Sequence, residues 1–335
     1  MNKFWKWTIK VILGFIAFII LLIIIAAINQ YISNKIDEKK YPPPGKIVDI
    51  GGYRLHLNCS GKKGPSVVLD SGLGDFSLTW YYIQPQIAKF THVCSYDRAG
   101  LGWSDKGPNP RTSIKIAQEL HTLLHNANVK PPYVLVGHSL GGLNMQVFAN
   151  LYPNEVAGLI LLDSSHENQE KFLQKLRPGD SAFQIKIKMF WYLVKPIWLP
   201  KTLAKYIISE DVPKEISSLD FAISFNTKNS FTNYEESKSF TKDLPSLKND
   251  FLKGKPLIVI SGGKYEQIPG TTKEEMKKII QVWMSFQNDL VSKSQKGQHW
   301  IAENSGHMIP LQEPQIVVKA VKEMVKEIRE PNIIE

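Results

Sequence analysis

The sequence lacks several features that would point away from a globular enzyme. It contains no internal repeat and no recognisable nucleic-acid-binding motif. Charged residues make up only 21% of the 335 positions and apolar residues 43%, which excludes an intrinsically disordered chain. The net charge of +10 is high enough to suggest binding to nucleic acid, but no nucleic-acid-binding motif accompanies it.

Acidic residues are nearly missing from one segment, residues 171–206. Eight Lys and Arg stand there against the single Asp180, and this excess accounts for most of the net charge. Aromatic side chains are interleaved with the basic ones: Phe172, Phe183, Phe190, Trp191, Tyr192, Trp198 and Tyr206. A basic, aromatic surface suits contact with a membrane better than contact with nucleic acid. We therefore predict no nucleic-acid partner.

The N-terminal apolar run lacks a signal-peptidase site. From Ile9 to Ile28, "IKVILGFIAFIILLIIIAAI", Lys10 is the only charge. A helix of this length rises about 30 Å, enough to span a bilayer. A cleaved signal peptide is the alternative, but its apolar region is usually shorter and "AAINQYIS" offers no small-x-small site. We expect a transmembrane helix that is retained.

The short segment before this helix is expected to be a cytoplasmic tail, residues 1–8, with the bulk of the chain outside the cytoplasm. Residues 29–45 follow the span and end in "DEKKYPPPGK", whose consecutive prolines favour an extended linker. The expected product is a single-pass membrane protein.

Eight short β-rich runs alternate with helical stretches after the linker. The first two, "KIVDI" and "YRLHLNC", look like a hairpin, and a helix is expected near "SLTWYYIQPQIAKF". Apolar strands that alternate with helices predict an α/β fold with a mainly parallel sheet covered on both faces. The core is expected in two parts, 46–163 and 251–335, separated by a helical cap insertion, 164–250.

A strand runs into a cluster of small residues in "YVLVGHSLGG", residues 133–142. Gly137-x-Ser139-x-Gly141 between a strand and a helix is the nucleophile-elbow pattern, although a lone GxSxG string also arises by chance. A helix that begins near Leu140 directs its free N–H groups toward the serine and favours a developing oxyanion. We predict that Ser139 is a nucleophile.

A serine nucleophile needs a base, and "ENSGHMIPLQEP" places His307 after the last strand. A surface-loop histidine is the ordinary alternative, but the chain order serine, acid, histidine favours the base. His138 is expected to be packed or hydrogen-bonded locally. His121 and His125 could bind a metal, yet without carboxylate or cysteine partners they fit the polar face of a helix, so we predict no metal.

From about Lys46 onward, apart from much of the insertion, the chain resembles the α/β-hydrolase superfamily. The matching pieces are "GHSLGG", "YDRAGLGWSD", "LDSGLG" and "SGHMIPLQEP". The resemblance implies an eight-stranded, mostly parallel sheet and no cofactor. It also implies an oxyanion hole built from the Leu140 N–H and one from the loop after the third strand. That loop usually begins His-Gly, whereas here it reads Ser71-Gly72-Leu73-Gly74, so by position Leu73 supplies the second N–H.

The family implies two candidates for the acid that orients the histidine. It usually follows the strand after the insertion, where "SGGKYEQIP" offers Glu266, and in some members it ends the strand before the insertion, which here falls on Asp163. Many relatives carry a non-catalytic aspartate at the earlier point. We favour Asp163 because it has the shorter reach and lies at a strand end, and keep Glu266 as the alternative. Asp97 is expected to hold loops together.

The two cysteines, Cys59 and Cys94, lie in strands that the family's strand order makes neighbours. A disulfide is feasible if the registers match, and an exported domain would meet an oxidising environment. Two buried free thiols are the alternative, because a slip of one residue turns the side chains to opposite faces. Both alternatives stay open at this point.

Together these features predict a membrane-anchored serine hydrolase that cleaves a carboxylic ester of an apolar or amphiphilic acyl group. The aromatic cap suggests such a substrate, but its side chains serve equally well as the cap's own core. An aminopeptidase or amidase of the same fold is the alternative enzyme, and it needs an anionic feature in the cap to bind a substrate amine. A non-catalytic binding protein is the alternative from a different class.

Overall fold

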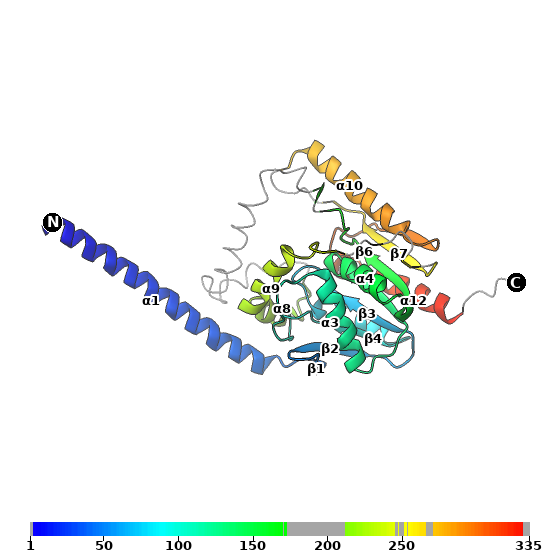
Figure 1. Ribbon diagram of the computed structural model, residues 1–335, viewed down its shortest axis with the longest axis horizontal. Helices are drawn as coiled ribbons and strands as arrows, with labels where there is room; N and C mark the ends of the chain where they lie inside the picture. The colour runs from blue at the N-terminus through cyan, green and yellow to red at the C-terminus, as the bar shows by residue number, and fades with distance from the viewer. Residues whose placement is uncertain are drawn as a thin grey trace.

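An eight-stranded sheet forms the centre of the computed structural model, which describes residues 3–169, 171–172, 212–244, 247, 251–252, 254–265 and 271–330 (Figure 1). The strand order is β1-β2-β4-β3-β5-β6-β7-β8. The strands are β1 (Lys46–Asp49), β2 (Arg54–Ser60), β3 (Ser66–Asp70), β4 (Val93–Tyr96), β5 (Tyr133–His138), β6 (Val156–Leu162), β7 (Leu257–Gly262) and β8 (Gly297–Ala302).

The pairing confirms the predicted α/β fold with a mostly parallel sheet. β1 and β2 form the expected antiparallel hairpin, and β2 also pairs antiparallel with β4. Every other neighbouring pair runs parallel. The carboxyl ends of the parallel strands therefore meet at one edge of the sheet, where α/β proteins place their binding sites.

Helices pack on both faces of the sheet and bury two separate apolar clusters. Alternate residues of β5 supply both, because successive strand side chains point to opposite faces. Leu135 belongs to the cluster with α3 (Ser113–Asn126), α4 (Leu140–Leu151) and α10 (Lys273–Val291). Val134 and Val136 belong to the cluster with α2 (Gln84–Ile87) and α12 (Pro314–Arg329).

The helix expected near "SLTWYYIQPQIAKF" is broken into two short pieces. A 3₁₀ turn, Ser77–Trp80, precedes the four-residue α2. Pro85 lies in the first turn of α2, where its missing N–H costs nothing, but it could not have occupied the interior of one long helix. The predicted single helix was wrong because the proline sets the break.

The N-terminal helix α1 (Lys3–Lys40) extends away from the sheet (Figure 1). It contains the predicted span Ile9–Ile28, its most apolar window has a mean hydropathy of 3.5, and none of that window is buried. By length and composition α1 could cross a membrane. The helix continues into the predicted linker and ends at Lys40, ahead of Pro42, which disfavours helical residues before it.

The end of α1 contacts the folded core and the cap. Trp103 donates its indole N–H to the Tyr41 carbonyl at 2.9 Å, and the Gln30 amide donates to the Phe225 carbonyl at 3.4 Å. Phe225 follows α8 (Ser217–Ser224), which with α9 (Thr227–Ser237) lies between β6 and β7 in the chain. Of the predicted basic, aromatic segment, residues 171–206, only Lys171 and Phe172 belong to the described residues.

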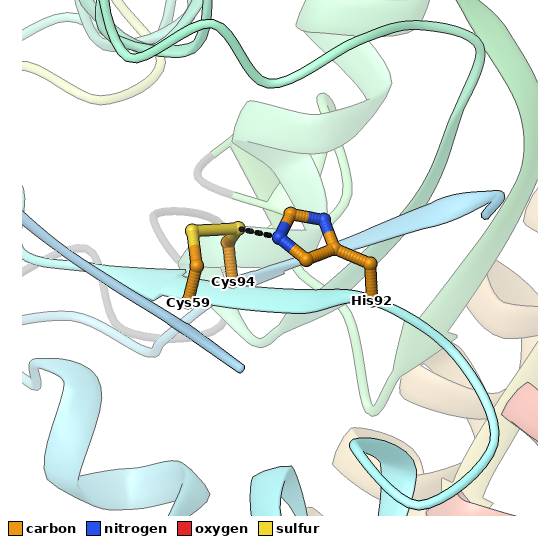
Figure 2. Close-up of side chains that lie close together, drawn as sticks. All are labelled: Cys59, His92 and Cys94. Carbon is orange, nitrogen blue, oxygen red and sulfur yellow. Dashed lines mark hydrogen bonds between the residues drawn. A yellow bond between two sulfur atoms is a disulfide. The ribbon is translucent and has the colours of Figure 1, made fainter. Parts of the chain in front are cut away.

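Cys59 and Cys94 are directly paired across β2 and β4 and are joined by a disulfide. Their Cα atoms are 4.1 Å apart, as the close pairing of antiparallel strands requires. The His92 ring lies against this bond, with Nε2 3.8 Å from the Cys94 sulfur (Figure 2). The three residues resemble a metal-ligand set, but sulfurs bonded to each other are not available as thiolates.

Candidate active site

Ser139 lies in a strained turn between β5 and α4. Its φ of 52° and ψ of −119° fall in a region that non-glycine residues rarely adopt. The turn is held by the neighbouring strand: the Ser139 N–H donates to the Leu162 carbonyl at 3.0 Å, and the Ser165 N–H donates to the Ser139 carbonyl at 2.9 Å. Backbone strain of this kind is concentrated at functional sites. It persists only where the hydrogen bonds and packing of the surrounding fold hold the residue in place.

The glycines on either side of Ser139 allow the close backbone contacts of this turn. A Cβ on Gly137 would lie 2.4 Å from the Gly141 carbonyl oxygen, and one on Gly141 would lie 2.3 Å from the Asp70 carbonyl oxygen. Both distances are far below van der Waals contact, and the obstacles are backbone atoms that cannot rotate away. The glycines of the GxSxG string are therefore required by geometry.

The structure brings Ser139, His307 and Asp163 into one hydrogen-bonded chain. His307 Nε2 is 3.0 Å from Ser139 Oγ, and His307 Nδ1 is 2.6 Å from Asp163 Oδ2. An ionised carboxylate only accepts, so Nδ1–H donates to Asp163 and Nε2 is left to accept from the serine hydroxyl. The His307 side chain is 48% exposed, whereas that of Asp163 is 6% exposed. The His307 ring thus faces the cavity that contains Ser139, and the Asp163 carboxylate lies behind it.

Asp163 is held by a residue that sequence reasoning did not identify. Trp283, on α10, donates its indole N–H to Asp163 Oδ1 at 2.8 Å, and the Gly262 N–H approaches the same oxygen at 3.4 Å. Each carboxylate oxygen therefore has its own partner. No local motif marks Trp283, since its contact depends on how α10 packs beside β6 and β7. Glu266, the alternative acid, lies outside the described residues.

The loop that carries His307 is held from two sides. His138 Nε2 donates to the His307 carbonyl at 2.8 Å, and the Gly306 N–H donates to Gln312 Oε1 at 2.7 Å. Burial, with the nearby His307, lowers the pKa of His138 to about 3, so its ring stays neutral. His138 is hydrogen-bonded locally, as the sequence indicated.

The two residues expected to form the oxyanion hole lie beside the serine. Leu140 is the first residue of α4, and Leu73 lines the same cavity as Ser139. The loop before Leu73 is fixed by Arg98, whose guanidinium donates to the Ser71 and Gly72 carbonyls at 2.7 Å each. Backbone N–H groups held in this way can stabilise an oxyanion without reorganising.

Arg98 is a buried charge shared between the core and the cap. It forms ion pairs at 2.7 Å with Asp70 at the end of β3 and with Glu236 on α9. Glu236 is 0% exposed, so neither partner is screened by water. Sequence reasoning missed Arg98 and Glu236, because their positions, 98 and 236, gave no sign that they would meet.

Two cavities flank His307. One of about 600 Å³ contains Ser139 and is lined by the cap helix α8. The other, about 350 Å³, lies on the Asp163 and Trp283 side, and α10 contributes the apolar side chains of Met276, Ile279 and Ile280 to its wall. A larger cavity of about 800 Å³ lies beside the disulfide and contains none of the three residues of the hydrogen-bonded chain. Of these three cavities, the one at Ser139 gives a small molecule access to the Ser139 hydroxyl.

Asp97 holds loops together, as its sequence context indicated. Its carboxylate accepts from the Ser77 and Trp103 N–H groups and from the His56 ring, at 2.8 to 2.9 Å. Burial disfavours the charged form, but these hydrogen bonds outweigh it and lower the pKa of Asp97.

The expectation that His121 has no carboxylate partner was wrong. His121 does have a carboxylate partner, because Glu155 Oε1 lies 3.0 Å from its Nε2. The His121 ring also stacks on Tyr152 at a centroid distance of 3.9 Å. The partner comes from the turn after α4, so the helix that carries His121 gave no sign of it.

Residues 65–314 match the family described as the alpha/beta hydrolase fold, and the chain belongs to this family. Three relatives are similar over most of this chain. The uncharacterised protein YqjL of Bacillus subtilis is 28% identical over 82% of this chain and 90% of its own. The probable transporter efuK of Hormonema carpetanum is 24% identical, and an uncharacterised vacuolar membrane protein of Saccharomyces cerevisiae 26%. This chain spans only 42% and 46% of those two relatives.

Solved structures share the fold at lower identity. A probable hydrolytic enzyme from Pseudomonas aeruginosa aligns with a TM-score of 0.65 and 18% identity, over 85% of this chain and 95% of that one. A thermophilic esterase from Thermogutta terrifontis aligns with a TM-score of 0.54 and 20% identity, over 84% and 98%. At such identities the likeness establishes the fold alone.

Proposed function

We propose that this protein is a serine hydrolase that cleaves a carboxylic ester through an acyl-enzyme on Ser139. The observation that carries the proposal is the chain of hydrogen-bonding distances, 3.0 Å from Ser139 to His307 and 2.6 Å from His307 to Asp163, at the wall of a cavity. A nucleophile, a base on its hydroxyl and a carboxylate on the base are the arrangement that acyl transfer needs.

The reaction proceeds in two halves. Ser139 Oγ attacks the acyl carbon while His307 Nε2 takes the hydroxyl proton, and the N–H groups of Leu140 and Leu73 stabilise the oxyanion. Collapse breaks the ester bond, and His307 gives the proton to the departing alcohol. Water then attacks the acyl-enzyme with His307 again as base, which releases the carboxylic acid and regenerates Ser139. Asp163 keeps Nδ1 protonated and stabilises the charged ring throughout.

Replacement of Ser139 tests this function. Ser139→Ala is expected to abolish hydrolysis of p-nitrophenyl esters and labelling by a fluorophosphonate probe, while the melting temperature stays near that of the unmodified protein. Ser285→Ala, on the exposed face of α10, is the matched control and should keep both reactions. Full activity in pure Ser139→Ala protein would reject the assignment. Failure of the unmodified protein to react with the probe would favour the non-catalytic alternative.

The acid is tested by a pair of variants. Asp163→Asn should lower kcat by orders of magnitude, about 10⁴-fold when the tautomer of the histidine is no longer fixed. Glu266→Gln should leave kcat within about twofold of the unmodified protein, since on this proposal Asp163 and not Glu266 orients His307. The reverse result would move the acid to Glu266.

Amide hydrolysis is the second candidate and uses the same groups. The anionic feature that an aminopeptidase needs has a counterpart in Asp220, which α8 of the cap places at the wall of the Ser139 cavity. Aminoacyl arylamides measured beside the p-nitrophenyl esters separate the two, because the enzyme's preference follows from the ratio of their kcat/KM values.

We propose further that α1 anchors the protein in a membrane and that the hydrolase core and cap lie on its extracytoplasmic side. The exposed apolar surface of α1 and the name of the yeast relative, a vacuolar membrane protein, support the anchor. The Cys59–Cys94 disulfide supports the orientation, because such bonds persist in oxidising compartments. The proposed division is that of the sequence: tail 1–8, span 9–28, linker 29–45, core 46–163 and 251–335, and cap 164–250.

A further inference from the structure

The cavity at Ser139 contains two carboxyl groups that the proposed chemistry does not use. Asp75 comes from the loop after β3, and Asp220 comes from the cap helix α8. Among the described residues neither forms an ion pair with a basic side chain. The Asp75 carboxylate has no hydrogen bond within that part of the chain, and Asp220 accepts only a long one, 3.4 Å, from the Ser224 hydroxyl.

A third acceptor lies beside Asp75. His138 lines the same cavity and is 1% exposed, and its Nδ1 has no hydrogen-bond partner within the described part of the chain. The Nδ1 edge faces Gly72: a Cβ on this glycine would lie 3.1 Å from Nδ1 and 3.0 Å from Asp75 Oδ2. The two atoms thus border the same small space at the cavity wall.

The tautomer of His138 is fixed by its other nitrogen. Nε2 lies 2.8 Å from the His307 carbonyl oxygen, which can only accept, so Nε2 carries the hydrogen. In a neutral ring Nδ1 is then a lone pair. Asp75, Asp220 and His138 Nδ1 are therefore all acceptors. The two aspartates are half-buried, and His138 Nδ1 is fully buried, where an acceptor without a donor is unfavourable.

The nearest basic group does not supply that donor. The Arg98 guanidinium donates to Asp70, to Glu236 and to the Ser71 and Gly72 carbonyls. The Asp70 and Glu236 carboxylates already match the positive charge of Arg98, so Asp75 and Asp220 add further negative charge. The cavity beside Ser139 therefore carries excess negative charge that a ligand can neutralise.

A cationic organic group fits these acceptors better than a metal ion does. One ion bound at about 2.0–2.2 Å draws its ligand atoms together. Among the described residues, the ligand atoms of Cys59, His92 and Cys94 lie within 4.8 Å of one another, whereas Asp75, Asp220 and His138 do not form such a group. A protonated amine has N–H donors in several directions and can bind Asp75 and His138 Nδ1 while Asp220 attracts it from the cap.

We propose that the Ser139 cavity is a binding site for a substrate with a protonated amine, recognised by Asp75, Asp220 and the Nδ1 lone pair of His138. This inference rests on the proposed function, since it names the substrate class of the same site. The energetics agree with it. Burial raises the pKa of Asp75 to about 6 and the pKa of Asp220 to about 6, and a cation would relieve the cost of keeping both groups ionised at neutral pH.

The test compares two esters of matched shape in the full chain in detergent micelles. The p-nitrophenyl esters of 6-aminohexanoate and heptanoate differ in an ammonium in place of a terminal methyl group. The unmodified protein should prefer the cationic ester by about tenfold or more in kcat/KM. Asp75→Asn and Asp220→Asn should each lower this ratio toward one, by about tenfold, since a hydrogen bond to a charged group contributes at least about a factor of ten. Asp243→Asn, an exposed aspartate of the cap region outside the cavity, is the matched control and should keep the preference.

The outcomes separate this inference from the function on which it rests. A ratio of one or less in the unmodified protein, or a ratio that neither variant changes, would overturn the amine site while hydrolysis of heptanoate kept the proposed function intact. Hydrolysis of neither ester would overturn the proposed function and the substrate class with it. Binding gives an independent readout: n-hexylammonium should raise the melting temperature of Ser139→Ala more than 1-hexanol does, and Asp220→Asn in that background should remove the difference.

Discussion

At the scale of single residues, the hydrogen-bonded chain depends on a donor far from it in sequence. Trp283 occupies Asp163 Oδ1, which leaves Oδ2 for His307. Trp283→Phe keeps most of the packing but removes the indole N–H. We expect kcat for p-nitrophenyl esters to fall about tenfold, since a hydrogen bond to a charged group contributes about 1.5–3 kcal/mol.

The matched control for this prediction is Trp300→Phe on β8. The Trp300 indole N–H donates to Gln298 of its own strand at 3.1 Å, so its loss should leave kcat within about twofold. An unchanged kcat in Trp283→Phe would show that this tryptophan only packs against Asp163. A fall in the melting temperature without a fall in kcat would lead to the same conclusion.

The pH dependence of amine preference follows from the two cavity aspartates. Burial raises the pKa of Asp75 and the pKa of Asp220 to about 6. At Asp75, the positive charges of Arg98 and His307 lower the pKa and the negative charge of Glu236 raises it. At Asp220, the negative charge of Asp75 raises the pKa as well. Below these pKa values the two carboxyl groups are neutral and do not attract a cation. They become anionic, and attract the substrate ammonium, as the pH rises through about 6. The preference for 6-aminohexanoate over heptanoate should therefore increase from about pH 5 to 7.5.

The ratio of the two esters is the quantity to measure, because protonation of His307, the proposed base, lowers both rates and largely cancels in their ratio. The substrate ammonium titrates near 10.4, so it stays charged over this range. A preference that is constant between pH 5 and 7.5 would contradict an electrostatic origin in Asp75 and Asp220.

At the scale of secondary-structure elements, an ion pair connects the cap helix α9 to the oxyanion loop. Arg98 donates to Glu236 through Nε and Nη2 and to the Gly72 carbonyl through Nη2. In Glu236→Gln the Arg98 guanidinium stays paired with Asp70 but loses the charged acceptor of its Nε–H and Nη2–H groups, and a hydrogen bond to a charged group contributes about 1.5–3 kcal/mol. Glu236→Gln should lower the free energy of unfolding by about 3 kcal/mol and also lower kcat, because the loop that holds Leu73 loses its brace.

The preceding residue provides the control for this variant. The Glu235 side chain is 7% exposed and pairs with Lys238, which is 41% exposed, and an ion pair whose cation remains in water contributes at most about 1 kcal/mol. Denaturant unfolding of Glu235→Gln should therefore show a loss below about 1 kcal/mol, with kcat unchanged. Equal losses in the two variants would mean that the Arg98 pair has no special role.

The elements themselves were largely predictable from the sequence. Strand periodicity and length identified all eight strands, and the GxSxG string between β5 and α4 predicted the turn that the structure shows at Ser139. The failures involve contacts between distant elements. Trp283, Arg98 and Glu236 occupy ordinary helical or loop positions in the sequence, and only the packing of α10, α9 and the β4 loop brings them to the site.

The Cys59–Cys94 disulfide could not be decided from local sequence patterns. Periodicity cannot fix the register between β2 and β4, and one residue of slip would have separated the thiols. The register is set by the whole antiparallel pairing, Leu57 with Tyr96 through Ser60 with Val93. The same holds for the two aspartates in the Ser139 cavity. Asp75 comes from the loop after β3 and Asp220 from the cap, so no local sequence pattern shows that they line one cavity.

At the scale of the whole molecule, the anchor and the cap adjoin each other. The Gln30 side chain of α1 reaches the Phe225 carbonyl at the end of α8, the helix that carries Asp220. The apolar part of α1 ends before this contact, at about Ile28, so the membrane surface would lie beside the cap and not beside the far edge of the sheet. A substrate with an amine and an apolar chain could then approach the cavity from the interface.

Attachment through α1 is expected to survive carbonate and high-salt washing of membranes, because burial of an apolar span exceeds what surface charges contribute. A chain that starts near Lys40 should be found in the soluble fraction and should hydrolyse p-nitrophenyl esters with unchanged kcat, since α1 contributes no residue to the Ser139 cavity. Fractionation followed by immunoblotting and N-terminal sequencing measures both. Release of the full-length chain by salt alone would mean that α1 does not span the bilayer, and a trimmed N-terminus in the medium would identify it as a cleaved signal peptide.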